Sequence, residues 1–201
     1  MIITDKEQLK QKCEPCKSIE EGEEIKDYKE AEQIAAKLLK ALASSKKGIG
    51  LAANQIGINK RVCVVNVKEP IALVNPVITE HSDLKFPFAE GCLSFPNKKV
   101  KTERYEWIKV KADNHIEEMY FSADSRKIED AFECACIQHE IDHLDGITMF
   151  ERKSKGMTIK RTSPKLGRNT KVTITKGSDS KILKYKKIEP FLEDGWILAE
   201  Q

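Results

Sequence analysis

The segment QHEIDHLDG, residues 138–146, constrains the fold and chemistry of this chain most, because it holds two of the four histidines, four residues apart. Apolar residues recur at helical spacing before it, so we predict one helix over residues 127–144 with Gly146 as its stop. His139 and His143 then share a helix face whose other residues are apolar. Buried imidazoles need partners for their nitrogens, and one divalent metal ion would satisfy both.

Glu140 is the candidate general base of such a site. It follows the first histidine and lies about a hundred degrees further round the helix. There it would flank the ion without binding it and could take a proton from water at the metal. The alternative is a helix with two satisfied core histidines and a solvated glutamate. His-Glu-x-x-His arises rarely by chance in a chain with so few histidines, so we favour the metal site.

The third ligand decides the class of site, since a catalytic metal usually takes three protein ligands and leaves one position for water. One group of metalloproteases uses His-x-x-Gly-x-x-His, but this chain has Met149 at the last position. Another group uses a downstream carboxylate. No aspartate or glutamate lies between Arg152 and Ser178, which weakens that alternative and leaves it open.

A thiolate is the other possible ligand, and EGCLSFP (90–96) offers Cys92 in a stretch that looks extended and rich in turns. The remaining cysteines are weaker candidates. Cys63 lies in an apolar strand, and Cys136 is on the helix but too near the histidines. CEPC (13–16) resembles half a zinc ribbon without its second pair, which favours a structural role.

GIGLAANQIG, residues 48–57, combines glycines with a side-chain amide but lacks the ending of a phosphate-binding loop. With the two segments above, in this order, it resembles the three signature motifs of the peptide deformylase family: Gly-x-Gly-x-Ala-Ala-x-Gln, Glu-Gly-Cys-Leu-Ser and Gln-His-Glu-x-Asp-His. The resemblance covers roughly residues 25–150. It implies an α+β fold, with antiparallel or mixed sheets packed around a central helix that carries HExxH. It also implies hydrolytic removal of the formyl group from N-formylmethionyl peptides of nascent proteins, with release of formate.

The resemblance further implies a role for each motif residue. The ligands of one divalent ion would be Cys92, His139 and His143. That ion would be Fe²⁺ in cells, with Zn²⁺, Ni²⁺ or Co²⁺ also accepted. Glu140 would be the general base, and the side-chain amide of Gln55 and the backbone N–H of Leu93 would stabilise the oxyanion. The substrate would contact the backbone of Gly50 and, through its methionine side chain, a pocket bordered by Ile49, Phe132, Ala135, Cys136 and His139.

Two further positions bear on the framework of the site. Glu90 and Arg104 resemble a buried pair that braces the cysteine loop, a structural role. Asn54 stands where the family usually has proline, and we expect this to loosen the loop slightly without touching a catalytic atom.

The rest of the chain reads as an ordinary cytoplasmic protein. Its polar start predicts no secretory signal, and no apolar run is long enough to cross a bilayer, so we expect reduced cysteines, no membrane partner and a monomer. Besides the histidine helix we predict a helix over residues 24–45. We also predict strands over residues 61–67, 71–79 and 105–113.

The C-terminal end differs from the rest in charge. Between Arg152 and Lys187 it has thirteen basic residues and one acidic residue, Asp179, whereas the whole chain has a net charge of only +3. We predict a catalytic domain over residues 1–151 and a basic extension over residues 152–201. In the extension, KVTITKGSDSKILKYKK would form a hairpin around a Gly-Ser-Asp-Ser turn. This hairpin is either a solvated cover or an electrostatic arm for the ribosome, and a protein that only binds RNA, with a structural metal, is the non-enzymatic alternative.

Overall fold

The structure, a computed structural model, describes residues 2–16, 28–45, 47–123, 127–154, 171–176, 179–184 and 197–198. The chain divides into two compact units, Met1–Gly156 and Met157–Gln201. The division falls a few residues after the predicted boundary, and Ser154 still bonds to the first unit through its backbone N–H and the Lys101 carbonyl (2.8 Å). The roles assigned to the two parts stay predictions.

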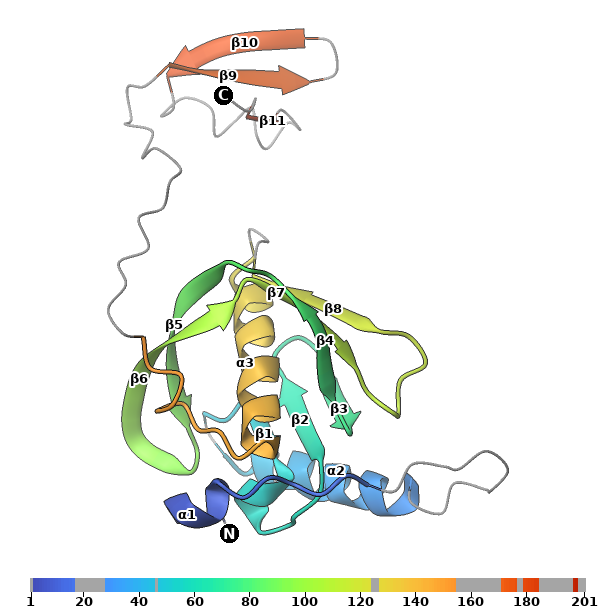
Figure 1. Ribbon diagram of the computed structural model, residues 1–201. Helices are drawn as coiled ribbons and strands as arrows, with labels where there is room; N and C mark the ends of the chain where they lie inside the picture. The colour runs from blue at the N-terminus through green and yellow to red at the C-terminus, as the bar shows by residue number, and fades with distance from the viewer. Residues whose placement is uncertain are drawn as a thin grey trace. The chain divides into compact units, whose positions relative to one another are not determined.

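The described residues of the first unit form helices and three antiparallel sheets (Figure 1). The helices are α1 (Lys6–Leu9), α2 (Tyr28–Ala43), the 3₁₀ helix η1 (Ala53–Ile56) and α3 (Ile128–Leu144). The first sheet consists of β1 (Gly50–Ala52), β2 (Val62–Asn66) and β3 (Pro70–Val74), in that order. The second has the order β4 (Val77–His81), β7 (Trp107–Lys111), β8 (Met119–Ser122), and the third pairs β5 (Lys85–Cys92) with β6 (Phe95–Tyr105).

Helix α3 is the centre of this unit. Figure 1 shows it running through the middle of the unit, among the strands, while α2 lies across one end. It contacts β1, β2, β6, β8 and η1, and every residue from Glu133 to Leu144 is buried. The sequence pattern predicted one apolar face, but the helix is covered all round. Each polar side chain on it therefore needs a partner inside the protein.

Strand β2 separates two hydrophobic clusters, because successive side chains of a strand point to opposite faces. Cys63 and Val65 pack in the cluster that includes the apolar residues of α3. Val62 and Val64 pack in the cluster that includes the apolar residues of α2. The strand is thus buried on both faces, which explains its continuous apolar run. The sheet that starts at β1 is held firmly between the two helices.

Most predicted elements are confirmed, and the strand over residues 71–79 is wrong. The chain turns at Asn75, whose φ is 50°, so that β3 and β4 lie in different sheets. Asparagine tolerates this left-handed conformation, and Pro76 after it has no N–H for a ladder. The Asn75 side chain also bonds both backbone groups of Cys16, at 2.8 and 2.9 Å. A pattern of β-branched residues contains no sign of this corner.

The other differences are small. The predicted strand over residues 105–113 begins two residues later, because Tyr105 ends β6 instead. The predicted helix over residues 24–45 is confirmed from Tyr28 to Ala43, and its first four residues lie outside the described part. None of the described helices is long and apolar enough to cross a membrane.

The second unit contains a three-stranded antiparallel sheet in its described residues. It has the order β10 (Asp179–Lys184), β9 (Lys171–Lys176), β11 (Ile197–Leu198). The predicted hairpin is confirmed where it is described, and residues 185–187 lie outside that part. Asp179 and Ser180, which were predicted to lie in the turn, belong to β10 and pair with Lys176 and Thr175, and residues 177–178 lie outside the described part.

Gly146 follows α3 and Gly57 follows η1, and the two differ in how closely other atoms approach them. Gly146 has φ +73°, and a Cβ there would lie 2.2 Å from the Lys10 carbonyl oxygen, whereas Gly57 has φ +81° but its Cβ would meet only Ile3 Cδ1, at 3.9 Å. We expect Gly57→Ala to cost about 1 kcal/mol of unfolding free energy through backbone strain alone. Gly146→Ala should cost about 3 kcal/mol, because the N-terminal segment must also move. Urea denaturation of both variants measures the difference, and equal losses would contradict the steric contribution.

Candidate metal centre

The three predicted ligands come together at one point. The ligand atoms of Cys92, His139 and His143 all lie within 4.8 Å of one another, and this is the one such group that the described residues contain. Cys92 ends β5 before the turn into β6, and its Sγ is 3.2 Å from Nε2 of His143. In a tetrahedral site with metal–sulfur bonds of about 2.3 Å and metal–nitrogen bonds of about 2.1 Å, such donors lie about 3.5 Å apart. The donor set and its spacing fit a metal ion.

Glu90 orients the first histidine. Its Oε2 accepts a hydrogen bond from Nδ1 of His139 at 2.9 Å, which leaves Nε2 for an ion. Burial opposes ionisation of this carboxyl, yet hydrogen bonds from Arg104 and His139 lower its pKa to about 2. Burial likewise opposes a charge on His139, but Cys92 and Glu90 raise the pKa of that imidazole to about 10. The surroundings of His139 therefore favour positive charge, whereas burial lowers the pKa of His143 and keeps that imidazole neutral.

The pair of Glu90 and Arg104 is buried, as expected, and Arg104 also binds a second carboxylate. The Arg104 guanidinium contacts both Glu90 oxygens, one through Nε and one through Nη2 at 2.9 Å. Its Nη1 donates to Asp142, two residues after Glu140 on α3, at 2.5 Å. Arg152 also donates to Asp142, from Nε and Nη2. One arginine thus joins the strand before the cysteine to the helix that carries both histidines.

The carboxylate of Glu140 lies beside the candidate ligands, and one of its oxygens has no hydrogen-bond partner among the described residues. Its Oε2 is buried and has no hydrogen-bond partner in the protein, and burial raises the pKa of the group to about 7. The backbone of β1 runs directly against it. A Cβ on Gly50 would lie 2.4 Å from Oε1 of Glu140 and 2.6 Å from Sγ of Cys136. Only glycine allows this approach.

Gln55 reaches the site from η1. Its Oε1 accepts from the backbone N–H of Ala52 at 2.8 Å, which fixes the orientation of the amide. Its Nε2 lies 3.3 Å from Sγ of Cys92 and 3.1 Å from Oγ of Ser94. A side-chain N–H donor is therefore held next to the ligands. Leu93, the second predicted oxyanion donor, lies in the turn that follows Cys92.

The residues predicted to contact substrate differ in how far they are exposed to solvent. Ile49 and Phe132 are 38% and 40% exposed, which is unusual for large apolar side chains. Phe132 packs edge-on against Phe88, with ring centroids 5.1 Å apart. Ala135 and Cys136 are buried one turn before the histidines. Two apolar side chains thus remain exposed, one next to Gly50 in the chain and one on the helix that carries Glu140.

The comparisons with known proteins agree with this geometry. The family model described as polypeptide deformylase matches residues 1–158. A peptide deformylase of Prochlorococcus marinus (strain AS9601) is 35% identical over 150 residues, which cover 71% of each chain. A peptide deformylase of Heliobacterium modesticaldum is 45% identical over 107 residues, which cover 53% of this chain and 67% of the relative.

Solved structures give the same result. The crystal structure of a probable peptide deformylase from Synechococcus phage S-SSM7 matches with a TM-score of 0.61 and 34% identity, over 76% of this chain and 98% of that one. A class I type b peptide deformylase from Acinetobacter baumannii matches with a TM-score of 0.60 and 30% identity, over 75% and 97%. The chain belongs to the peptide deformylase family.

Family membership establishes the α+β deformylase fold and a metal-dependent hydrolase that removes the N-formyl group from nascent peptides. The family match ends at residue 158, two residues after the end of the first unit at Gly156. The metal species, the role of each residue and the role of the extension are proposals.

Three residues near the candidate ligands make contacts that the sequence did not predict. Ser94 is 1% exposed and accepts from Gln55, and Asp142 binds two arginines. Asn54 was expected to loosen its loop, but its Nδ2 donates to the backbone oxygen of His143 at 2.7 Å. The expected loosening stays a prediction, and this hydrogen bond is a contact that the sequence did not predict. A charged residue on a helix that holds two histidines was the available signal for Asp142, whereas no pattern indicates the contact of Asn54.

The other cysteines are explained by packing. Cys63 is fully buried in β2, as predicted. Cys13 and Cys16 are also buried, in different hydrophobic clusters, and neither belongs to a group of ligands. This agrees with the structural role expected for CEPC.

Arg104 gives the sharpest test of the framework around the site. Arg104→Met leaves the buried carboxylates of Glu90 and Asp142 without their shared cation, so we expect a loss of about 3–5 kcal/mol of unfolding free energy. Chemical denaturation measures it. The control is Lys109→Met, which removes the exposed pair with Glu80 and should leave the denaturation midpoint unchanged. Equal shifts of the denaturation midpoint in both variants would show that the buried network stabilises the protein no more than an exposed ion pair does.

Proposed function

We propose that Cys92, His139 and His143 hold one divalent metal ion and that Glu140 is the general base in hydrolysis of formylmethionyl peptides. The observation that supports this most directly is the convergence of the three ligand atoms beside a buried carboxylate oxygen without a partner. A bound divalent ion would lower the pKa of a water molecule and polarise the formyl oxygen. The resemblance to the family implies Fe²⁺, and one thiolate with two imidazoles would also accept Zn²⁺, Ni²⁺ or Co²⁺.

Glu140 would move the protons of the reaction. Its carboxylate takes a proton from the water that attacks the formyl carbon, and then gives it to the leaving amine nitrogen. Formate and a free N-terminal amine result. Gln55 supports the developing oxyanion through its side-chain N–H, which Ala52 holds in place, and Leu93 supports it through its backbone N–H.

The peptide would bind as an additional strand. β1 is the edge strand of its sheet, with β2 on one side only, and Gly50 lies at its start. Backbone groups at such an edge can pair with an extended peptide. Ile49 and Phe132 would then contact the methionine side chain, together with Ala135 and Cys136.

Replacing the base separates chemistry from metal binding. We expect Glu140→Gln to keep its metal and to lose at least about 10²-fold in turnover, because the amide cannot accept the proton. Formate release from formyl-Met-Ala-Ser, with protein purified anaerobically and loaded with iron, measures this. Cys92→Ala is the control for the ligand set and should lose bound metal as well as activity.

Several outcomes would contradict this assignment. Near-normal formate release by Glu140→Gln would remove Glu140 from its role, and a Cys92→Ala variant that bound metal as well as the wild type would remove the thiolate. Cleavage of blocked peptides at internal bonds, without formate, would instead support a zinc endopeptidase.

For the extension, we propose binding to ribosomal RNA. The observation is a direct cross-strand pairing of Lys171 with Lys184, both exposed, in the β9–β10 hairpin. Like charges at opposite positions destabilise a hairpin in isolation, and a polyanion would relieve the repulsion. An enzyme that acts on nascent chains benefits from such an attraction to the ribosome.

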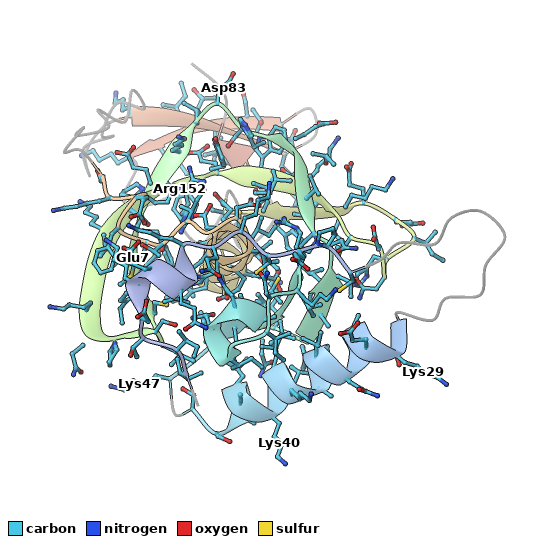
Figure 2. The ribbon with its side chains drawn as sticks, turned by 60° about the horizontal axis from the view of Figure 1, so that its bottom comes forward. Glu7, Lys29, Lys40, Lys47, Asp83 and Arg152 are labelled. Atoms are coloured by element: carbon cyan, nitrogen blue, oxygen red, sulfur yellow. The ribbon has the colours of Figure 1, made fainter. Side chains whose placement is uncertain are left out.

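The paired lysines can be tested in the full chain. The double variant Lys171→Gln and Lys184→Gln should bind ribosomal RNA more weakly and lower the slope of log affinity against log salt by about 2, at unchanged peptide turnover. The matched control is Lys29→Gln and Lys40→Gln on α2, which removes the same charge. Figure 2 shows both of these lysines pointing away from the first unit. Equal weakening in both variants would contradict a specific role of the hairpin.

A further inference from the structure

The C-terminal end of α3 is tied to three distant parts of the first unit. The last carbonyls of a helix have no partner within it and must find one elsewhere. The Leu144 oxygen accepts from the backbone N–H of Cys13 at 2.9 Å and from Arg61 at 3.2 Å. The His143 oxygen accepts from the N–H of Gly146 at 3.1 Å and from Nδ2 of Asn54 at 2.7 Å. Asn54 thus bonds directly to the backbone of a candidate ligand.

Asn54 and Gln55 are adjacent in η1, but their side chains reach different parts of the site. The Asn54 amide bonds to the helix at His143, and the Gln55 amide lies against Cys92 and Ser94 in the cysteine turn. The Cys92 sulfur in turn lies 3.2 Å from His143. These contacts close a ring that runs from η1 to the helix, to the cysteine and back to η1.

We propose that Asn54 is a positioning residue of the metal centre, whose side chain fixes the helix end that carries His143 relative to the cysteine turn. This rests on the proposed metal site. Asn54 is buried, so its hydrogen bond does not compete with bulk water. A residue without a side-chain donor at this position, proline included, removes the direct side-chain hydrogen bond between η1 and the ligand helix.

The role can be distinguished from ordinary stabilisation. Without Asn54, the His143 oxygen still has the N–H of Gly146, so no backbone group is orphaned. The Asn54 Oδ1 is buried without a protein partner, and an apolar replacement removes that unsatisfied atom as well. The two effects on stability oppose each other. The ligand geometry, however, loses its tie, and partners in the layer behind metal ligands commonly change metal affinity by about 10–100-fold.

The test compares metal release with stability in Asn54→Leu, using the full chain loaded with Zn²⁺ or Co²⁺. Transfer of the metal to a chelator should be at least about 10-fold faster than in the wild type. The absorption of the Co²⁺-loaded protein should shift, because the thiolate and imidazoles are held less uniformly. The thermal midpoint of the metal-free variant should stay close to that of the wild type. Asn54→Ala repeats the measurement without added bulk if leucine is not accommodated.

Asn114 provides the matched control. Its Nδ2 donates to the Ala72 oxygen at 2.8 Å and its Oδ1 accepts from the Val74 N–H at 2.9 Å, both in β3 and remote from the ligands. Asn114→Leu should lower the thermal midpoint and leave metal release unchanged.

Failure of this proposal and failure of the metal site give different results. A wild-type protein that bound Co²⁺ without thiolate absorption would contradict the site itself. A wild type with that absorption, beside an Asn54→Leu variant that released metal within about two-fold of it, would overturn the role of Asn54 alone.

Discussion

The burial of α3 from Glu133 to Leu144 is the constraint on which the rest of this deformylase depends. A helix enclosed on all sides has to satisfy every polar side chain inside the protein. Lys68 pairs with Glu133, the backbone of Tyr105 bonds to Gln138, and arginines bind Asp142. The buried polar atoms on this helix that remain without a protein partner are Oε2 of Glu140 and Nδ1 of His143. The Glu140 oxygen lies at the candidate site, whereas Nδ1 of His143 is the ring nitrogen other than the one beside Cys92, so only the Glu140 oxygen supports a catalytic role.

The sequence was sufficient for this helix and for the grouping of its histidines with Cys92, but not for the corners of the fold. Helical spacing, Gly146 and the His-Glu-x-x-His pattern are local signals, and the structure has the helix at Ile128–Leu144 as expected. Cys92 depended on the order of three motifs, since no local rule joins a thiol to histidines far along the chain. The corner at Asn75 was missed because a left-handed residue between two apolar runs looks like part of one strand.

The contacts of Asn54 and Asp142 were not predicted, for a related reason. Both residues act through partners that are remote in sequence, such as the His143 backbone and Arg104. Composition and periodicity report on the local chain, whereas a hydrogen bond across the core depends on tertiary packing. Substituting proline by asparagine was therefore interpreted as a loss of stiffness. In the structure it is also the gain of a donor, which proline cannot supply.

Charge balance explains why the site suits a divalent cation in particular. Glu90 and Asp142 are matched by Arg104 and Arg152, so the surrounding framework is close to neutral. Within it, a Cys92 thiolate and a Glu140 carboxylate add two negative charges, beside two imidazoles that must be neutral to bind a metal. A doubly charged ion cancels these charges in a buried volume where an unbalanced charge is costly. The raised pKa of His139 expresses the same demand, because a proton is the cation available to the side chains themselves.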